Sequence, residues 1–276
     1  MPEQENSFSD FLKYSISAPK RISKSYYTII FYGILLYLIM AILIKIPGIF
    51  TLSSYQPGEG AIYQLLKDQG LLALYSFIIN AKNYLFISII IFVCLESDQK
   101  GTVSISTLWQ QIKSFYKPLL LIIPTIWAII YISGLFTDLL AAETWISLIQ
   151  LLFIRPIMTI IFLINVVSMK NYKNILYLNI NKIINLVKVI DYKILLSLYV
   201  SSLALLYNYP GLIYYVRNPL VRKLTEDKTI NPMYSLLKIN YGFELLAFFI
   251  SIVVITITAA IAIYAIRSAD QQDIND

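Results

Sequence analysis

Two cationic side chains of this chain lie deep inside long apolar stretches. Arg155 stands ten residues from one end of the run 145–167 and twelve from the other, and Lys82 lies comparably deep in the run 71–95. A cation near the centre of a bilayer costs about 2.5–3.5 kcal/mol on insertion scales, so each residue is expected to face a bundle interior or a polar cavity. The pattern predicts either a site for an anion such as a phosphate or carboxylate group, or a structural role against carbonyls and hydroxyls.

Polar and helix-breaking residues accompany both cations. Asn80 and Asn83 belong to a polar stripe at helical spacing, about 120° around the helix from Lys82. Pro156 directly follows Arg155 and removes a backbone donor, which frees a carbonyl for a neighbouring guanidinium. We therefore predict an intramembrane polar site composed of Arg155, Lys82, Asn80 and Asn83.

The residue types that are missing exclude whole classes of chemistry. The sequence has no histidine and one cysteine, Cys94, which argues against His-based catalysis, intrachain disulfides and Cys- or His-rich metal sites. It has no G-x-x-x-x-G-K-[ST] run, so we expect no ATPase activity of its own. We expect no enzymatic activity, no cofactor and no metal. The acidic residues nearest to the apolar runs are expected at their ends, at Asp138, Glu143, Asp191 and Glu244.

The composition is that of a membrane protein. Apolar residues make up 58% of the 276 residues and charged residues 14%, against roughly 25% charged in soluble domains. About 20 apolar residues suffice for a helix to cross a bilayer. The sequence therefore predicts an all-α polytopic membrane protein with six transmembrane helices and interfacial amphipathic helices on the cytoplasmic side. The six expected spans are Tyr26–Ile46, Leu71–Leu95, Leu119–Phe136, Trp145–Val167, Ile194–Tyr215 and Leu245–Ile266.

The distribution of Lys and Arg predicts the orientation of these spans. With the N-terminus inside, thirteen of these cations fall in cytoplasmic segments and seven outside, five of the seven in the loop 216–241. The positive-inside rule then places both termini in the cytoplasm. The absence of an N-x-[ST] sequon favours a bacterial inner membrane. The loop 216–241, rich in cations and flanked by tyrosines, is either an interfacial anchor or a surface for an anionic lipid or polymer.

Amphipathic segments precede the odd-numbered spans. The clearest is 103–116, which Pro118 is expected to end; 174–190 repeats its pattern, and a weaker copy near the N-terminus is expected to end at Pro19. Such helices lie in the headgroup plane with lysines toward anionic lipid, although a helix that docks a partner ATPase would look similar. The residues expected to form the interfacial docking helix are Trp109, Ile112, Lys113, Phe115 and Tyr116.

The chain divides into a cytoplasmic tail 1–25, a membrane domain 26–266 and an acidic cytoplasmic tail 267–276. The order helix, span, span occurs over 7–95, 103–168 and 174–266, which suggests three repeated helical hairpins. The alternative is that any loop rich in lysine and isoleucine scores as amphipathic.

Two stretches resemble a known family. The run Lys100-Gly101-Thr102-Val103-Ser104-Ile105 resembles a Gly-x-x-Ser turn that leads into an amphipathic helix after span two. Phe153-Ile154-Arg155 and the apolar run that follows resemble an Arg-bearing span four. The family is the six-helix bacterial membrane family that includes the membrane domain of some glycerophosphodiester phosphodiesterases and YciC-like inner-membrane proteins. The resemblance implies a membrane scaffold or accessory domain, with no phosphodiesterase activity.

The expected function is that of a non-enzymatic envelope accessory or lipid-associated scaffold, in contact with the lipid bilayer and its anionic lipids and not with nucleic acid. One alternative is the permease subunit of an ABC-type exporter with an ATPase partner subunit. Asn231-Pro232-Met233-Tyr234 before the last span is similar to a motif of polysaccharide-exporter permeases. The other alternative is a membrane immunity protein that occupies a toxin.

Overall fold

The computed structural model describes residues 8–53, 61–139, 148–171, 188, 190–207 and 232–275. These residues form helices and short turns, with no strand among them. The elements are α1 (Phe8–Arg21), the 3₁₀ turn η1 (Ser23–Ser25), α2 (Tyr26–Ser53), α3 (Ala61–Lys100), α4 (Ile105–Leu139), the π-helical turn η2 (Gln150–Ile154), α6 (Arg155–Asn171), α8 (Tyr192–Tyr207) and α10 (Pro232–Asn275).

The helices form an all-α polytopic membrane fold, as the sequence predicts. Within the described residues, five helical segments are long and apolar enough to cross a membrane: 8–40, 76–100, 105–135, 150–169 and 246–269. A sixth, shorter apolar helix runs from Tyr192 to Leu205, and the rest of the expected fifth span lies outside the described residues.

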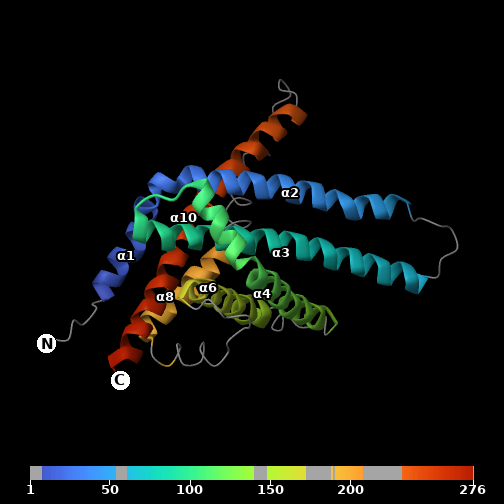
Figure 1. Ribbon diagram of the computed structural model, residues 1–276. Helices are drawn as coiled ribbons and strands as arrows, with labels where there is room; N and C mark the ends of the chain where they lie inside the picture. Colours follow the sequence, from blue (N-terminus) through green and yellow to red (C-terminus); the bar gives the residue numbers. More distant parts are fainter. Residues whose placement is uncertain are drawn as a thin grey trace.

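The long helices α2 and α3 run side by side as a hairpin, and α10 crosses the molecule past them (Figure 1). The C-terminal half of α10 packs against α1, α3, α6 and α8. Both chain ends lie at the same end of the bundle (Figure 1). The end of the bundle that holds both chain ends is the terminal end.

The core lies in the half of the bundle nearest the terminal end. In α3, every residue from Ile87 to Ser97 is buried, and in α6 burial is nearly continuous from Thr159 to Met169. By contrast, residues 148–153, which precede α6 and include most of the π-turn, are exposed except for Gln150. The tightly packed half therefore begins just after Arg155.

Two helices continue past the prolines that were expected to end them. α1 includes Pro19 and runs to Arg21, and α4 includes both Pro118 and Pro124 and runs unbroken to Leu139. The prediction that Pro118 separates an amphipathic helix from span three is therefore wrong. A proline costs one backbone hydrogen bond, whereas breaking the helix beside the hydrocarbon would leave several groups unpaired.

The amphipathic segments rest on the bundle by their apolar faces. In α1 the buried residues Phe11, Ser15 and Ala18 follow the helical period, and the Phe11 ring lies 5.3 Å from that of Tyr264 in α10. In the first turns of α4, Leu108 is fully buried. Part of the apolar face of each helix is therefore covered by the bundle, and the contact of the remainder with lipid stays a prediction.

The Gly-x-x-Ser stretch between α3 and α4 is a tight turn. Gly101 adopts φ +74° and donates its N–H to the Ser97 carbonyl, as a glycine does when it terminates a helix. The Ser104 hydroxyl accepts the N–H of Thr107 and caps the start of α4. Between them, the Val103 N–H donates to the Ser25 hydroxyl at 2.9 Å, which fastens the turn to η1.

Several sequence predictions fall outside the described residues. These are most of the amphipathic segment 174–190 and the cation-rich loop as far as residue 231. The last turns of the chain, 267–275, continue α10 as helix. The three-hairpin repeat and the domain limits stay predictions.

Candidate functional site

The backbone is irregular where α6 begins. Pro156 has no N–H to give to the Leu152 carbonyl four residues earlier, and residues Gln150–Ile154 widen into a π-helical turn. The Tyr199 hydroxyl, from α8, donates to the Leu152 carbonyl at 2.5 Å. The carbonyl freed by Pro156 is thus satisfied by a tyrosine, and the guanidinium expected from the sequence takes no part.

Gln150 secures the other end of this turn. Its buried side chain donates to the Ile130 carbonyl of α4 at 3.2 Å and lies 3.4 Å from the Ser133 hydroxyl. A Cβ at Gly134 would approach the Gln150 amide nitrogen to 2.9 Å, so the glycine leaves room for this contact. The π-turn is therefore held from α4 on one side and α8 on the other.

Arg155 begins α6, one turn before Thr159, whose hydroxyl donates to the Arg155 carbonyl at 2.9 Å. The Tyr84 hydroxyl interacts with the Thr159 side chain and lies within electrostatic reach of the Arg155 guanidinium. The Arg155 Nε is buried and has no hydrogen-bond partner. Across the described parts of the chain, no ion pair or hydrogen bond engages this guanidinium. Arg155 is thus a partly buried cation (Nε buried) without a counter-charge among these residues.

The rest of the predicted polar site is divided between two surfaces of α3. Lys82 is partly buried and has an interaction partner of its own. Asn80 bonds the Ser76 carbonyl at 2.7 Å, and the Trp127 indole of α4 donates to the Ser76 hydroxyl at 3.3 Å. Asn83 is exposed. Asn80 is therefore bonded within α3, and Arg155 is the member of the predicted set that has a buried donor without a hydrogen-bond partner.

A second charged cluster lies at the terminal end, around Asp98. Its carboxylate lies 3.5 Å from the Arg21 guanidinium of α1 and 3.0 Å from that of Arg267 in α10. It also accepts the Tyr14 hydroxyl at 2.5 Å, and the Arg21 guanidinium stacks 3.7 Å from the centroid of the Tyr14 ring. One carboxylate at the end of α3 thus joins α1 and α10.

Glu96 forms a smaller pair beside this cluster. Its buried carboxylate lies 3.0 Å from Lys100 and accepts the Gln111 amide of α4. Glu96 and Asp98 follow Leu95, the expected end of span two, so they are not among the acids at Asp138, Glu143, Asp191 and Glu244 that were expected nearest to the apolar runs. The signal was present in Leu95-Glu96-Ser97-Asp98, where two acids follow an apolar run directly.

The predicted docking helix turns two kinds of side chain in opposite directions. Ile112 and Phe115 pack against the core, the Phe115 ring 5.3 Å from that of Phe92. Trp109 and Tyr116 are about half exposed, and Lys113 is exposed with its Nζ 5.4 Å from the Trp109 ring centroid. The outward surface is therefore the aromatic and lysine side alone.

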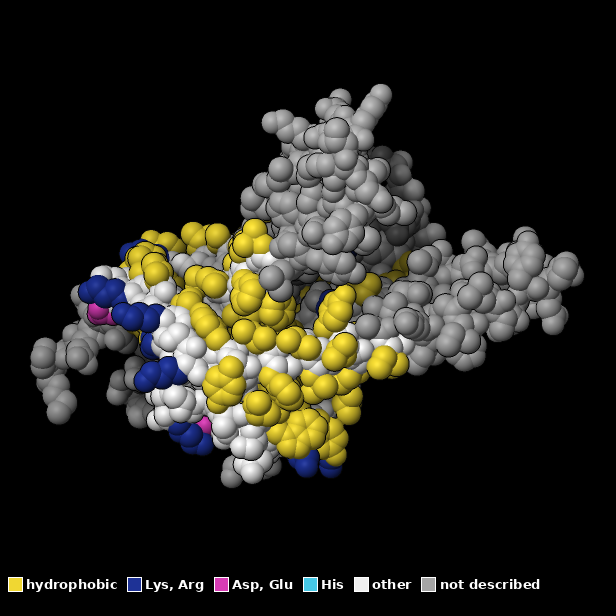
Figure 2. All heavy atoms as spheres, turned by 90° about the horizontal axis from the view of Figure 1, so that it is seen from above, with side chains coloured by type: hydrophobic (Ala, Val, Ile, Leu, Met, Phe, Trp, Pro, Cys, Tyr) yellow, Lys and Arg dark blue, Asp and Glu magenta, His cyan; other side chains and the backbone are white. Residues whose placement is uncertain are grey.

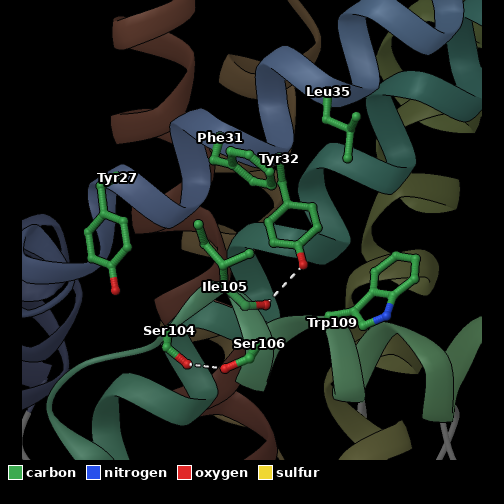
Figure 3. Close-up of a pocket in the computed structure, with 8 residues that line it drawn as sticks. All are labelled: Tyr27, Phe31, Tyr32, Leu35, Ser104, Ile105, Ser106 and Trp109. Atoms are coloured by element: carbon green, nitrogen blue, oxygen red, sulfur yellow. Dashed lines mark hydrogen bonds between the residues drawn. The ribbon is translucent and has the colours of Figure 1, made fainter.

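An open groove of about 670 Å³ lies between α2 and the first turn of α4 (Figure 3). The Tyr32 hydroxyl on its wall donates to the Ile105 carbonyl at 3.0 Å, and the Tyr27 hydroxyl to the Val103 carbonyl at 3.2 Å. These polar groups satisfy one another, so the groove presents a mainly apolar surface. Its lining residues are Tyr27, Phe31, Tyr32, Leu35, Ser104, Ile105, Ser106 and Trp109.

The unpartnered Arg155 and the mainly apolar groove are suited to binding a ligand. Within the described residues, no three His, Cys, Asp or Glu side chains gather as metal ligands. No family model matches the chain, and neither a curated protein nor a solved structure is significantly similar to it.

Proposed function

We propose that this chain is a non-enzymatic integral membrane protein that works as a lipid-associated accessory or scaffold of a bacterial inner membrane. Its terminal end would lie at the cytoplasmic surface and hold anionic lipid. This agrees with what the family resemblance implies.

The observation that carries the proposal is the pairing of exposed aromatic rings with lysines at the terminal end. Lys113 lies over Trp109, and the Lys193 Nζ lies 5.8 Å from the Phe8 ring centroid and 5.9 Å from that of Tyr192. Figure 2 shows Lys and Arg side chains along this edge, bordering exposed hydrophobic side chains. Aromatic rings and lysines together are typical of the membrane–water interface next to anionic lipid.

The outer face of α1 adds to this surface. Phe8, Leu12 and Ile16 are exposed at helical spacing, and Ile16 keeps 66% of its surface accessible. Lys13 lies beside them, and the opposite face of the helix packs on α10. A helix with an apolar stripe and lysines, held against a bundle at the terminal end, is suited to the headgroup region.

The test is lipid selection in nanodiscs made from equal amounts of phosphatidylcholine and phosphatidylglycerol. Native mass spectrometry of the released protein should show phosphatidylglycerol enriched at least threefold among retained lipids. The double variant Lys113→Glu/Lys117→Glu should bring retention close to the bulk ratio. Lys45→Glu/Lys67→Glu, which reverses two charges in the far parts of α2 and α3, is the matched control and should retain the enrichment. Equal retention by wild type and the first variant would contradict the proposal.

The same preparation tests the alternative of a permease subunit. The Trp109 side of α4 is exposed and carries a lysine, as a docking surface for an ATPase subunit would. A stoichiometric ATPase subunit that copurifies with the wild type and is lost in Trp109→Ala would replace the scaffold with a permease.

A further inference from the structure

Arg155 has the geometry of a ligand-binding cation inside the membrane domain. It is the first residue of α6, and it lies between the mostly exposed stretch 148–153 and the packed part of α6. Its Nε is buried without a partner. The acids that form ion pairs in the described part of the chain, Asp10, Glu96 and Asp98, all pair with other cations. An intramembrane ionisable residue in this state is by default a functional site.

The neighbouring groups are fixed in advance of any ligand. The Thr159 hydroxyl donates to the Arg155 carbonyl at 2.9 Å and interacts with the Tyr84 hydroxyl. The Tyr84 ring packs 4.6 Å from that of Phe162, centroid to centroid, in the packed half of the bundle. The Tyr84 phenol is therefore held within electrostatic reach of the guanidinium, and the π-turn, held by Tyr199 and Gln150, directly precedes Arg155 in the chain.

The surroundings also indicate what kind of molecule carries the anion. One turn before Arg155 in the chain, Leu151 and Leu152 are each more than a third exposed. Both leucines belong to the apolar span 150–169, and within a bilayer a free hydrated ion would have to shed its water at high cost to reach them. An anion attached to an apolar tail can place the tail along these leucines.

We propose that Arg155 binds the oxyanion head group of an anionic amphiphile, with Tyr84 near the head group and the apolar tail along the exposed leucines of the π-turn that precedes α6. A planar guanidinium donates two parallel hydrogen bonds to a carboxylate or a phosphate, so both head groups fit. This site is formed by α3 and α6 away from the lysines of the terminal end. It therefore stands or falls independently of the proposed function.

The experiment is a titration of the purified protein, delipidated in dodecyl maltoside, with dodecyl phosphate and separately with dodecanoate. Native mass spectrometry counts the bound anions. The wild type should bind one anion at least tenfold more tightly than Arg155→Gln. Lys45→Gln, which removes one cation from the far part of α2 and has the same net charge as Arg155→Gln, is the matched control and should bind as the wild type does.

A second variant and a competition experiment complete the test. Tyr84→Phe preserves the packing on Phe162 and should weaken binding threefold to tenfold, which serves as the test if Arg155→Gln does not fold. Inorganic phosphate at the concentration of the amphiphile should not compete. Unchanged binding in both Arg155→Gln and Tyr84→Phe would overturn the proposal, and equal competition by inorganic phosphate would overturn the assignment to an amphiphile.

Discussion

The surroundings of Asp98 and of Arg155 use the same residue types to opposite effect. At the terminal end, two arginines and a tyrosine converge on one carboxylate, with contacts between 2.5 and 3.5 Å. At the start of α6, one arginine lies near a tyrosine and a threonine. No carboxylate among the described residues forms an ion pair with it.

The difference shows that the charge of Asp98 stabilises the fold, whereas the charge of Arg155 destabilises it. Asp98 links three helices, and its charge is compensated twice over. Arg155 carries the insertion cost of a buried cation without a compensating partner among these residues. A charge that costs stability and is still rigidly positioned is suited to meet a ligand, whereas a fully paired one is suited to hold helices together.

The largest loss of stability is expected from Asp98→Asn. The change leaves Arg21 and Arg267 facing a neutral group and loosens α1 and α10 from α3. The carboxylate is mostly buried while its arginine partners are 31% and 46% exposed, so its loss is expected to cost about 2 kcal/mol, less than for a fully buried pair. The loss should appear as a lower free energy of unfolding in mixed SDS micelles. Asp10→Asn, at an exposed pair, should cost no more than about 0.5 kcal/mol, and equal losses in the two variants would remove the distinction.

In contrast to Asp98→Asn, the variant Arg155→Leu is expected to raise the free energy of unfolding. In neutral detergent without an anionic amphiphile, this variant should gain about 2 kcal/mol of stability, because an uncompensated intramembrane cation has been removed. The same SDS titration measures the gain. Arg267→Leu is the contrasting variant and should lose stability, since its guanidinium pairs with Asp98. A loss in Arg155→Leu similar to that in Arg267→Leu would mean that both arginines are structural.

Tyr14→Phe tests how much of the Asp98 cluster depends on its hydroxyl. The variant keeps the ring under Arg21 and deletes one hydrogen bond to a carboxylate. A loss of about 1.5 kcal/mol is expected from a hydrogen bond to a charged group. Thermal unfolding followed by circular dichroism is a suitable measurement, with Tyr116→Phe on the exposed face of α4 as a control that should not change. A neutral Tyr14→Phe would leave the arginines alone responsible for the cluster.

The smallest effect is expected from Tyr199→Phe. The variant removes the hydroxyl that satisfies the Leu152 carbonyl, at a cost of about 1 kcal/mol. Because the π-turn positions Arg155, the affinity for dodecyl phosphate should fall as well. Tyr192→Phe, at a highly exposed tyrosine of the same helix, should change neither quantity. A stability loss with unchanged affinity would separate the turn from the anion site.

Part of the candidate site follows from local pattern. The depth of Arg155 in an apolar run and the proline after it can be recognised from the sequence of α6 alone. The outward Trp109 and Lys113 can likewise be recognised from the sequence of α4 alone. Asp98 could not be assigned in the same way. Its partners Tyr14 and Arg267 lie 84 and 169 residues away, and only the packing of α1 and α10 on α3 brings them together.

The sequence by itself determined the class of protein, the approximate positions of the spans and the turn from Gly101 to Ser104. These features depend on composition, on apolar run length and on backbone preferences, all of which are local. The tertiary structure decided which faces of the amphipathic helices are covered, that helices continue past Pro19 and Pro118, and that Asp98 is paired while Arg155 is left without a partner among the described residues. Those outcomes depend on which side chains meet across helices. The sequence of one segment does not determine which distant segment it will contact.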